Sequence, residues 1–232
     1  MPGARHSQPA QPQPGTRPGL SHERALAARG FTPVAGVDEA GRGAWAGPVA
    51  AGAVILPLEL ATMRRLRGLT DSKKLNAAER ARFATLIRNV AICLAVGWAD
   101  AIEIDRLGIV PATRLAMRRA IDGLPTPPGG LVIDALRLPE VVVRQDVFFF
   151  ADAISLSAAA ASVLAKTERD ARMAAMDDVW PGYGFAAHKG YGTVAHAAAL
   201  RALGPCPEHR WTFQPVALVV GGAPRRAPQA RI

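Results

Sequence analysis

The chain has 232 residues, half of them apolar, so it can bury one substantial core and is expected to form one domain with appendages. Its two cysteines, Cys93 and Cys206, stand far apart without Cys-x-x-Cys or histidine spacing, which indicates neither a disulfide framework nor a zinc site. That cysteine usage fits a reducing cytoplasm, and because no apolar run is long enough to span a bilayer and no signal-peptide core is present, we expect a soluble protein.

The net charge of +9 is concentrated at the two ends of the chain. Residues 1–30 carry four Arg and one Glu, and residues 219–232 carry three Arg, so each end contributes +3. The first thirty residues also contain five prolines among Gln, Gly and Arg, with hardly an aliphatic run. We therefore predict a disordered Pro-rich tail over residues 1–30, a folded domain over 31–218 and a flexible basic tail over 219–232.

In the body of the chain, strands come first and helices then alternate with them. The first two strands are joined by a glycine-rich turn, which predicts antiparallel neighbours. Asn76 with Glu79, and Asp100, have the form of caps at the start of helices. The predicted strands cover residues 31–37, 48–56, 91–98, 131–133 and 141–150; the predicted helices cover 77–89, 101–121 with an interruption at Gly108, 155–176 and 193–203. This order predicts an α/β fold, a mixed sheet flanked by helices.

Four acids lie at the boundaries of these elements. Asp38 and Glu39 follow the first strand, Asp134 follows the fourth, and Asp152 precedes the long helix. Carboxylates are the ligands that Mg²⁺ and Mn²⁺ prefer, and such ions neutralise a phosphodiester and activate water. Taken singly, each aspartate is better explained as a helix cap or a solvated strand end than as a metal ligand. Neighbouring strand residues also point to opposite faces, so Asp38 and Glu39 converge only if a nearby glycine breaks the strand.

Lysine use marks further segments. Of 28 basic residues only four are lysines, and a chain that uses Arg by default keeps Lys where a compact ammonium suits the task. Two of them lie in Asp71-Ser72-Lys73-Lys74, either a phosphate-facing loop or a salt-bridged surface turn. Residues 183–193 hold Lys189 between two tyrosines. They either present a ring and donors to a sugar-phosphate chain or form a plain glycine-rich loop.

Together these segments resemble bacterial ribonuclease HII, in the right order over about residues 31–215. The motifs that carry the resemblance are Asp38-Glu39-Ala-Gly41-Arg42-Gly43, Asp71-Ser72-Lys73-Lys74-Leu75, Ile133-Asp134, Asp152-Ala-Ile-Ser155 and His188-Lys189-Gly190-Tyr191. The resemblance implies a ribonuclease H-like fold with a small C-terminal helical region. It also implies a monomeric endoribonuclease that hydrolyses the RNA strand of RNA/DNA hybrids. Such an enzyme cuts 5′ of single ribonucleotides in duplex DNA, leaving 3′-hydroxyl and 5′-phosphate ends.

The resemblance also implies a role for individual positions. The metal-binding catalytic acids, holding two Mg²⁺ or Mn²⁺ ions, would be Asp38, Glu39, Asp134 and Asp152. The residues that contact the ribose 2′-hydroxyl would be Gly41, Arg42 and Gly43, largely through backbone atoms. Tyr191 would pack on the neighbouring deoxyribose. The phosphate-binding residues would be Ser72, Lys73, Lys74 and Lys189.

The chain departs from the family pattern at two positions near Asp152. Phe150 stands where family members usually carry Lys, and Ile154 where many carry a basic residue, so these departures remove candidate phosphate contacts and leave the acids intact. The sister family, ribonuclease HIII, carries a folded N-terminal substrate-binding domain, whereas residues 1–30 here are too short and Pro-rich for one. The alternative from another class is a non-catalytic nucleic-acid-binding protein on the same fold.

Overall fold

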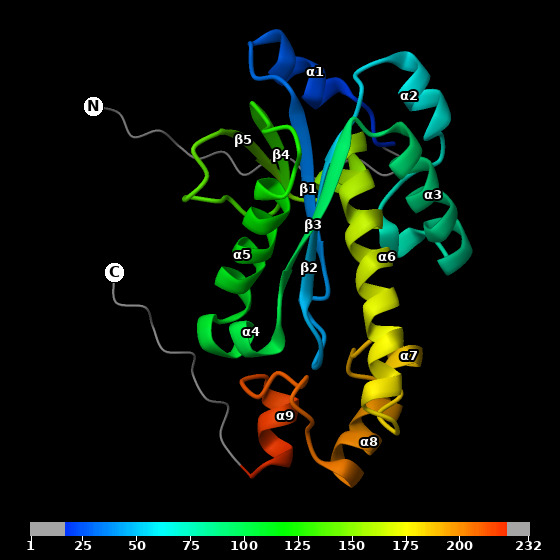
Figure 1. The fold of residues 1–232 in the computed structure, drawn as a ribbon, viewed down its shortest axis with the longest axis vertical. Coiled ribbons are helices and arrows are strands. Elements are labelled where there is room, and N and C mark those ends of the chain that lie inside the picture. The colour runs from blue at the N-terminus through cyan, green and yellow to red at the C-terminus, as the bar shows by residue number, and fades with distance from the viewer. Residues whose placement is uncertain (1–16, 222–232) are drawn as a thin grey trace.

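A five-stranded mixed sheet forms the centre of the computed structural model, which describes residues 17–221 (Figure 1). The strands are β1 (Val34–Ala40), β2 (Val49–Ile55), β3 (Cys93–Ala99), β4 (Gly130–Asp134) and β5 (Arg144–Phe148). Their order is β3-β2-β1-β4-β5. The pairs β1–β2 and β2–β3 are antiparallel, whereas β1–β4 and β4–β5 are parallel. The predicted α/β class and the antiparallel pairing of the first two strands are confirmed.

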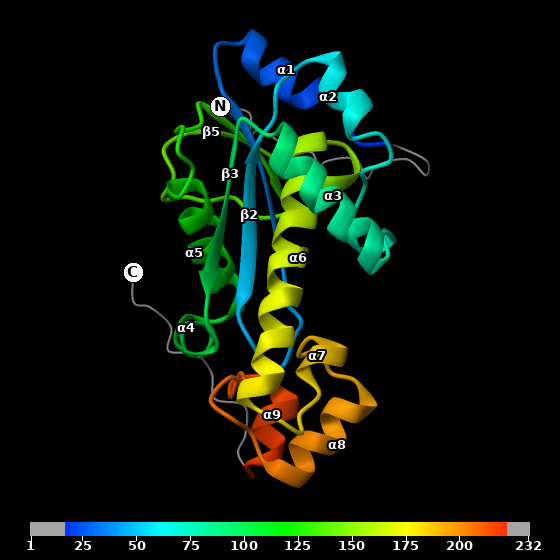
Figure 2. The same cartoon turned by 45° about the vertical axis from the view of Figure 1, so that its right-hand side comes forward.

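Helices cover both faces of the sheet. Helix α5 (Ile109–Asp122) packs on one face, while α6 (Leu156–Val179) crosses the other with α3 (Ala77–Val90) beside it (Figures 1 and 2). At Gly36, in the middle of β1, an added Cβ would lie 2.1 Å from the backbone carbon of Ser157 in α6. Glycine therefore lets α6 lie directly against the strand that carries Asp38 and Glu39.

Several helices begin where the sequence predicts. Asn76 is the N-cap of helix α3 and Asp100 is the N-cap of α4 (Ala101–Leu107), each in a complete capping box. The N-cap of the long helix α6 is Ser155, whose hydroxyl accepts a hydrogen bond from the Ala158 N–H at 3.1 Å. Asp152 lies earlier, in the 3₁₀ turn η2 (Ala151–Ala153), and so is not the cap of that helix.

The predicted disordered tail is wrong for residues 17–30. Helix α1 (Ser21–Ala28) forms there, with the side chain of Leu26 fully buried. The carboxylate of Glu23, also fully buried, accepts hydrogen bonds from the Ser155 hydroxyl at 2.7 Å and from the Ser157 N–H at 3.0 Å. These partners lie more than a hundred residues away, which is why local composition did not reveal the helix. Residues 1–16 lie outside the described residues.

A small helical region packs at the end of the sheet where α6 finishes (Figure 2). It contains α7 (Phe185–His188), α8 (Val194–Leu203) and α9 (Gln214–Val219), and α8 ends at the predicted Gly204. The remaining short elements, α2 (Leu60–Arg65) and the 3₁₀ turn η1 (Ser72–Lys74), lie between β2 and α3. Most of the predicted basic tail, residues 222–232, lies outside the described residues. Within residues 17–221, no helix has the length and apolar character needed to cross a membrane.

Candidate active site

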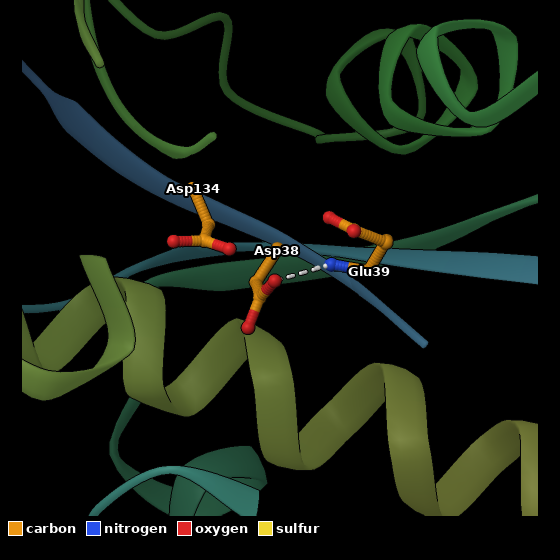
Figure 3. Close-up of side chains that lie close together, drawn as sticks. All are labelled: Asp38, Glu39 and Asp134. Atoms are coloured by element: carbon orange, nitrogen blue, oxygen red, sulfur yellow. Dashed lines mark hydrogen bonds between the residues drawn. The ribbon is translucent and has the colours of Figure 1, made fainter. Parts of the chain in front are cut away.

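Three of the predicted acids meet at one point of the sheet. Side-chain oxygens of Asp38, Glu39 and Asp134 all lie within 4.8 Å of one another (Figure 3). The expected break in the strand is not present, because β1 continues through both acids to Ala40. Asp38 points toward α6 and Glu39 away from it, yet both carboxylates remain close to Asp134 (Figure 3).

The parallel pairing of β1 and β4 explains this convergence. Val37 is the register partner of Ile133, so the next residue of each strand, Asp38 and Asp134, lies at the same edge of the sheet. The Asp134 carboxylate also accepts a hydrogen bond at 2.7 Å from the N–H of Ala151, at the start of η2. The turn that carries Asp152 is therefore docked directly on the acid cluster.

Burial and mutual repulsion disfavour the negatively charged form of each acid in the cluster, a cost that a bound cation would compensate. Burial, followed by the charges of Glu39, Asp134 and Asp152, raises the pKa of Asp38 well above its usual value. Burial also raises the pKa of Glu39 and of Asp134, although Arg42, whose guanidinium lies 3.0 Å from Glu39, opposes the shift at Glu39. One buried Glu39 oxygen has no hydrogen-bond partner among the described residues. An oxygen-only, uncompensated site of this kind fits a hard divalent cation.

Asp152 stands beside this trio and has a partner that the sequence did not reveal. Its pKa is raised to about 7, first by burial and then by the charges of Asp71 and Asp134. Asp71, a loop acid in the sequence interpretation, lies within hydrogen-bonding reach of Asp152 and also accepts the Lys73 N–H at 2.9 Å. The structure thus adds a fifth carboxylate to the site. The sequence marked Asp71 as part of a loop motif, but only the folded arrangement brings it beside Asp152, so its place at the site was not predicted.

A cleft of about 310 Å³ opens next to the acids. Its lining comes from four separate parts of the chain and contains Glu39, Ala40, Gly41, Arg42, Gly43, Ser72, Lys73, Lys166 and Tyr191. Among residues 17–221, two predicted phosphate-binding residues do not line this cleft, namely Lys74 and Lys189. The Lys189 ammonium instead donates a hydrogen bond to the carbonyl of Ala186 in α7. Lys166 is a lining residue missing from the predicted site, although the scarcity of lysine had marked it.

Two buried arginines, Arg169 and Arg210, donate hydrogen bonds to backbone carbonyls of the glycine-rich loop after β1. Arg210 donates to the carbonyls of Gly41, Arg42 and Gly47 at 2.7, 2.8 and 3.0 Å. Arg169 donates to three further carbonyls, among them Pro48 at 2.8 Å, and an added Cβ on Gly41 would lie 1.9 Å from its Nε atom. Both side chains are fully buried, and among the described residues neither has a carboxylate within 4.0 Å.

Tyr191 lies at the wall of the cleft with two cations over its ring. The Arg169 guanidinium carbon is 5.3 Å from the ring centroid and the Lys166 ammonium is 5.5 Å from it. Lys166 is in turn paired with Asp170 at 2.6 Å. The ring is half-buried, and its remaining surface lines the cleft.

The mixed sheet, the carboxylates at its edge and the adjoining cleft define the class of metal-dependent phosphodiester hydrolases with a ribonuclease H-like fold. A family model described as Ribonuclease HII matches residues 35–216, and the chain belongs to that family. It is 51% identical over 200 residues to Ribonuclease HII of Chloroflexus aggregans, covering 86% of this chain and 94% of that protein. The corresponding protein of Roseiflexus castenholzii is 50% identical over 203 residues, with 87% and 91% covered.

Solved structures support the fold. The crystal structure of ribonuclease H2 from Pyrococcus horikoshii OT3 superposes with a TM-score of 0.67 at 22% identity, covering 80% of this chain and 96% of that one. Bst-RNase HIII in complex with Mn²⁺ gives a TM-score of 0.63 at 25% identity, covering 85% and 72%. Relatives at about half identity are named Ribonuclease HII, which favours that family over the HIII alternative. The predicted enzyme class, a metal-dependent ribonuclease, is confirmed.

Proposed function

We propose that this endoribonuclease, which hydrolyses the RNA strand of RNA/DNA hybrids, also cuts duplex DNA on the 5′ side of a single embedded ribonucleotide. The products would be a 3′-hydroxyl and a 5′-phosphate. The observation that supports this most strongly is the convergence of the glycine-rich loop, Ser72, Lys73 and Tyr191 on one cleft beside Glu39. A site that reads one sugar needs its recognition groups within a nucleotide of its catalytic acids.

We further propose that Asp38, Glu39, Asp134 and Asp152 hold Mg²⁺ or Mn²⁺. Such an ion, when bound, neutralises the scissile phosphate and activates water. The chain itself supplies the oxygen ligands and fixes their spacing through the β1–β4 pairing and the Ala151 hydrogen bond to Asp134. Asp71, next to Asp152, adds negative charge that favours a cation there.

Recognition of the ribose is assigned in this proposal to the loop Gly41-Arg42-Gly43. Arg210 engages the carbonyls of Gly41 and Arg42 from behind, which fixes the loop on the side away from the cleft. At Gly43 an added Cβ would meet nothing within 4 Å, so a sugar has room to approach the backbone. A backbone hydrogen bond to the 2′-hydroxyl distinguishes RNA from DNA at one nucleotide.

Tyr191 would test the next sugar, because a ring packed on a deoxyribose leaves little room for an additional hydroxyl. Ser72 and Lys73 would bind phosphate within the cleft, together with Lys166, while Lys74 and Lys189 would contact phosphates outside it. Phe150, 55% exposed in place of a lysine, would contribute no charge to duplex binding. We propose that the enzyme acts as a monomer in the cytoplasm.

The test is a cleavage assay on a labelled DNA duplex that carries one ribonucleotide, with Mg²⁺ or Mn²⁺ present. The proposal predicts a single cut on the 5′ side of that ribonucleotide. Cleavage of a long RNA/DNA hybrid without cleavage of this duplex would leave the family activity intact and refute the single-ribonucleotide function. An all-DNA duplex of the same sequence is the matched control and should stay uncut.

A further inference from the structure

A chain of buried histidines lies directly behind Tyr191, outside the catalytic machinery described above. His196 and His209 are both fully buried, and their Nε2 atoms lie 3.1 Å apart. The Nδ1 atom of His196 is 3.0 Å from the carbonyl oxygen of Tyr191, and the Nδ1 atom of His209 is 3.0 Å from the N–H nitrogen of Cys206. The chain therefore connects the segment before α9 to the turn that carries Tyr191.

The partners at the two ends determine where each proton sits. A carbonyl oxygen only accepts, so His196 must carry its proton on Nδ1, which leaves its Nε2 atom as an acceptor in the neutral ring. At the other end the Cys206 N–H donates to His209, so the Nδ1 atom of His209 is unprotonated and its proton lies on Nε2. The two assignments agree where they meet, because His209 Nε2–H then donates to His196 Nε2.

Both rings are suited to remain neutral. Burial, with the neighbouring His196 charge next in size, lowers the pKa of His209 to about 4, and burial also lowers the pKa of His196. The ring of His188 stacks on His196 with centroids 4.3 Å apart, and two positive charges at that distance would repel, which also disfavours protonation of His196. A proton added to His196 at Nε2 would point two N–H groups, those of His196 and His209, at each other, and the hydrogen bond between the two rings would be lost.

This cluster does not form a metal site. Each ring uses its two nitrogens on opposite sides, so the rings cannot direct their free electron pairs at one point. Among residues 17–221, the group with three candidate ligand atoms within 4.8 Å is Asp38, Glu39 and Asp134. Hydrogen bonding is therefore what the histidines provide.

We propose that His196, in its Nδ1–H form and oriented by His209, is a positioning residue that fixes Tyr191 for recognition of the sugar next to the ribonucleotide. The proposal rests on the function assigned to Tyr191 above. Besides His196, the Tyr191 carbonyl accepts only the Thr193 N–H at 2.9 Å among the described residues, and that bond lies within the same turn. His196 thus supplies the connection between the turn and the body of α8, with its own N–H capped by the Thr193 hydroxyl.

Two substitutions at His196 separate positioning from packing. His196→Asn keeps a donor near the Nδ1 position, toward Tyr191, but leaves the buried His209 N–H without an acceptor. His196→Gln keeps an acceptor near the Nε2 position, toward His209, but removes the donor to Tyr191. If His196 has a purely structural role, the variant that is less stable should also be the less selective one. If His196 positions Tyr191, His196→Gln should be the less selective variant and His196→Asn the less stable one.

The experiment measures kcat/KM on a duplex with one ribonucleotide and on a uniform RNA/DNA hybrid, together with the melting temperature, for the wild type, both His196 variants and Tyr191→Ala. We expect His196→Gln to lose the preference for the single ribonucleotide by about tenfold, close to the effect of Tyr191→Ala, and His196→Asn to retain it within about twofold while melting at the lower temperature. Equal changes in the two His196 variants would overturn the proposal. An unchanged preference in Tyr191→Ala would refute the function assigned to Tyr191 and, with it, the positioning role.

A second measurement needs no variant and no activity. Long-range ¹⁵N–¹H correlation spectra of the wild-type protein near neutral pH distinguish the two neutral forms of each histidine. We expect the Nδ1–H form for His196 and the Nε2–H form for His209. An Nε2–H or doubly protonated His196 would overturn the inference even if the proposed function stands.

Discussion

Replacing Asp152 with asparagine should stabilise the metal-free protein while inactivating the enzyme. Burial and the charges of Asp71 and Asp134 raise the Asp152 pKa from 3.8 to about 7. The folded state therefore binds this proton more tightly than the unfolded chain, so the associated stability is present at low pH and lost as the pH rises toward about 7. An asparagine side chain in its place carries no such charge at any pH.

The size of the effect follows from the shift. Raising the pKa from 3.8 to about 7 corresponds to a ceiling of about 4 kcal/mol at about 1.4 kcal/mol per unit. About 2.5 kcal/mol of that change falls between about pH 5 and about pH 8. Relative to the wild type, Asp152→Asn should therefore gain about this much stability over that interval. Added Mg²⁺ should reduce the difference, because a bound cation neutralises the wild-type carboxylate.

Urea unfolding of the wild type and of Asp152→Asn, in the presence of EDTA at about pH 5 and at about pH 8, measures the effect. Asp170→Asn is the matched control, because Asp170 is paired with Lys166 at 2.6 Å and its loss should lower the free energy of unfolding at both pH values. The reasoning is refuted if Asp152→Asn is less stable than the wild type at the higher pH. A gain of the same size at both pH values would contradict the assigned cause.

Three further predictions concern recognition and the N-terminal helix. Tyr191→Ala should lower the rate on a single embedded ribonucleotide much more than on a uniform hybrid, with little change in melting temperature; the reverse pattern would mean that the ring only packs. Leu26→Ala should lower the free energy of unfolding by about 2–5 kcal/mol, whereas Leu60→Ala, at a 62% exposed side chain, should change it by less than about 0.5 kcal/mol. Phe150→Lys should tighten hybrid binding at low salt and steepen the salt dependence of log K by about one unit; an unchanged slope would show that this position lies away from the phosphates.

Local signals in the sequence predicted most of the fold. The glycine-rich turn between β1 and β2 and the capping boxes at Asn76 and Asp100 depend on residues close together in the chain, and the structure contains all three. Helix α1 escaped prediction because its stability comes from distant contacts, such as Glu23 with Ser155. The prediction of a disordered tail is therefore wrong at Leu26, whose side chain is fully buried in the core.

The site was predictable in its acids and less so in their surroundings. Strand ends marked Asp38, Glu39 and Asp134, and the parallel pairing of β1 and β4 brings them together. The sequence placed Asp71 in a phosphate-facing loop or a surface turn, whereas the structure places its carboxylate beside Asp152. The buried positions of Arg169 and Arg210 were not predicted, because arginine is ordinarily a surface residue and only the folded loop supplies the carbonyls that bind them.

The most direct test of the central claim compares the wild type with Asp38→Asn and Asp134→Asn on a duplex carrying one ribonucleotide, in Mg²⁺. We predict that the wild type cuts once, on the 5′ side of the ribonucleotide. Each variant should lose more than about a hundredfold in rate while still folding and binding the hybrid, because a metal ligand is removed without loss of core packing. Variants that retain activity within about tenfold of the wild type would contradict the assignment of these carboxylates to the catalytic centre.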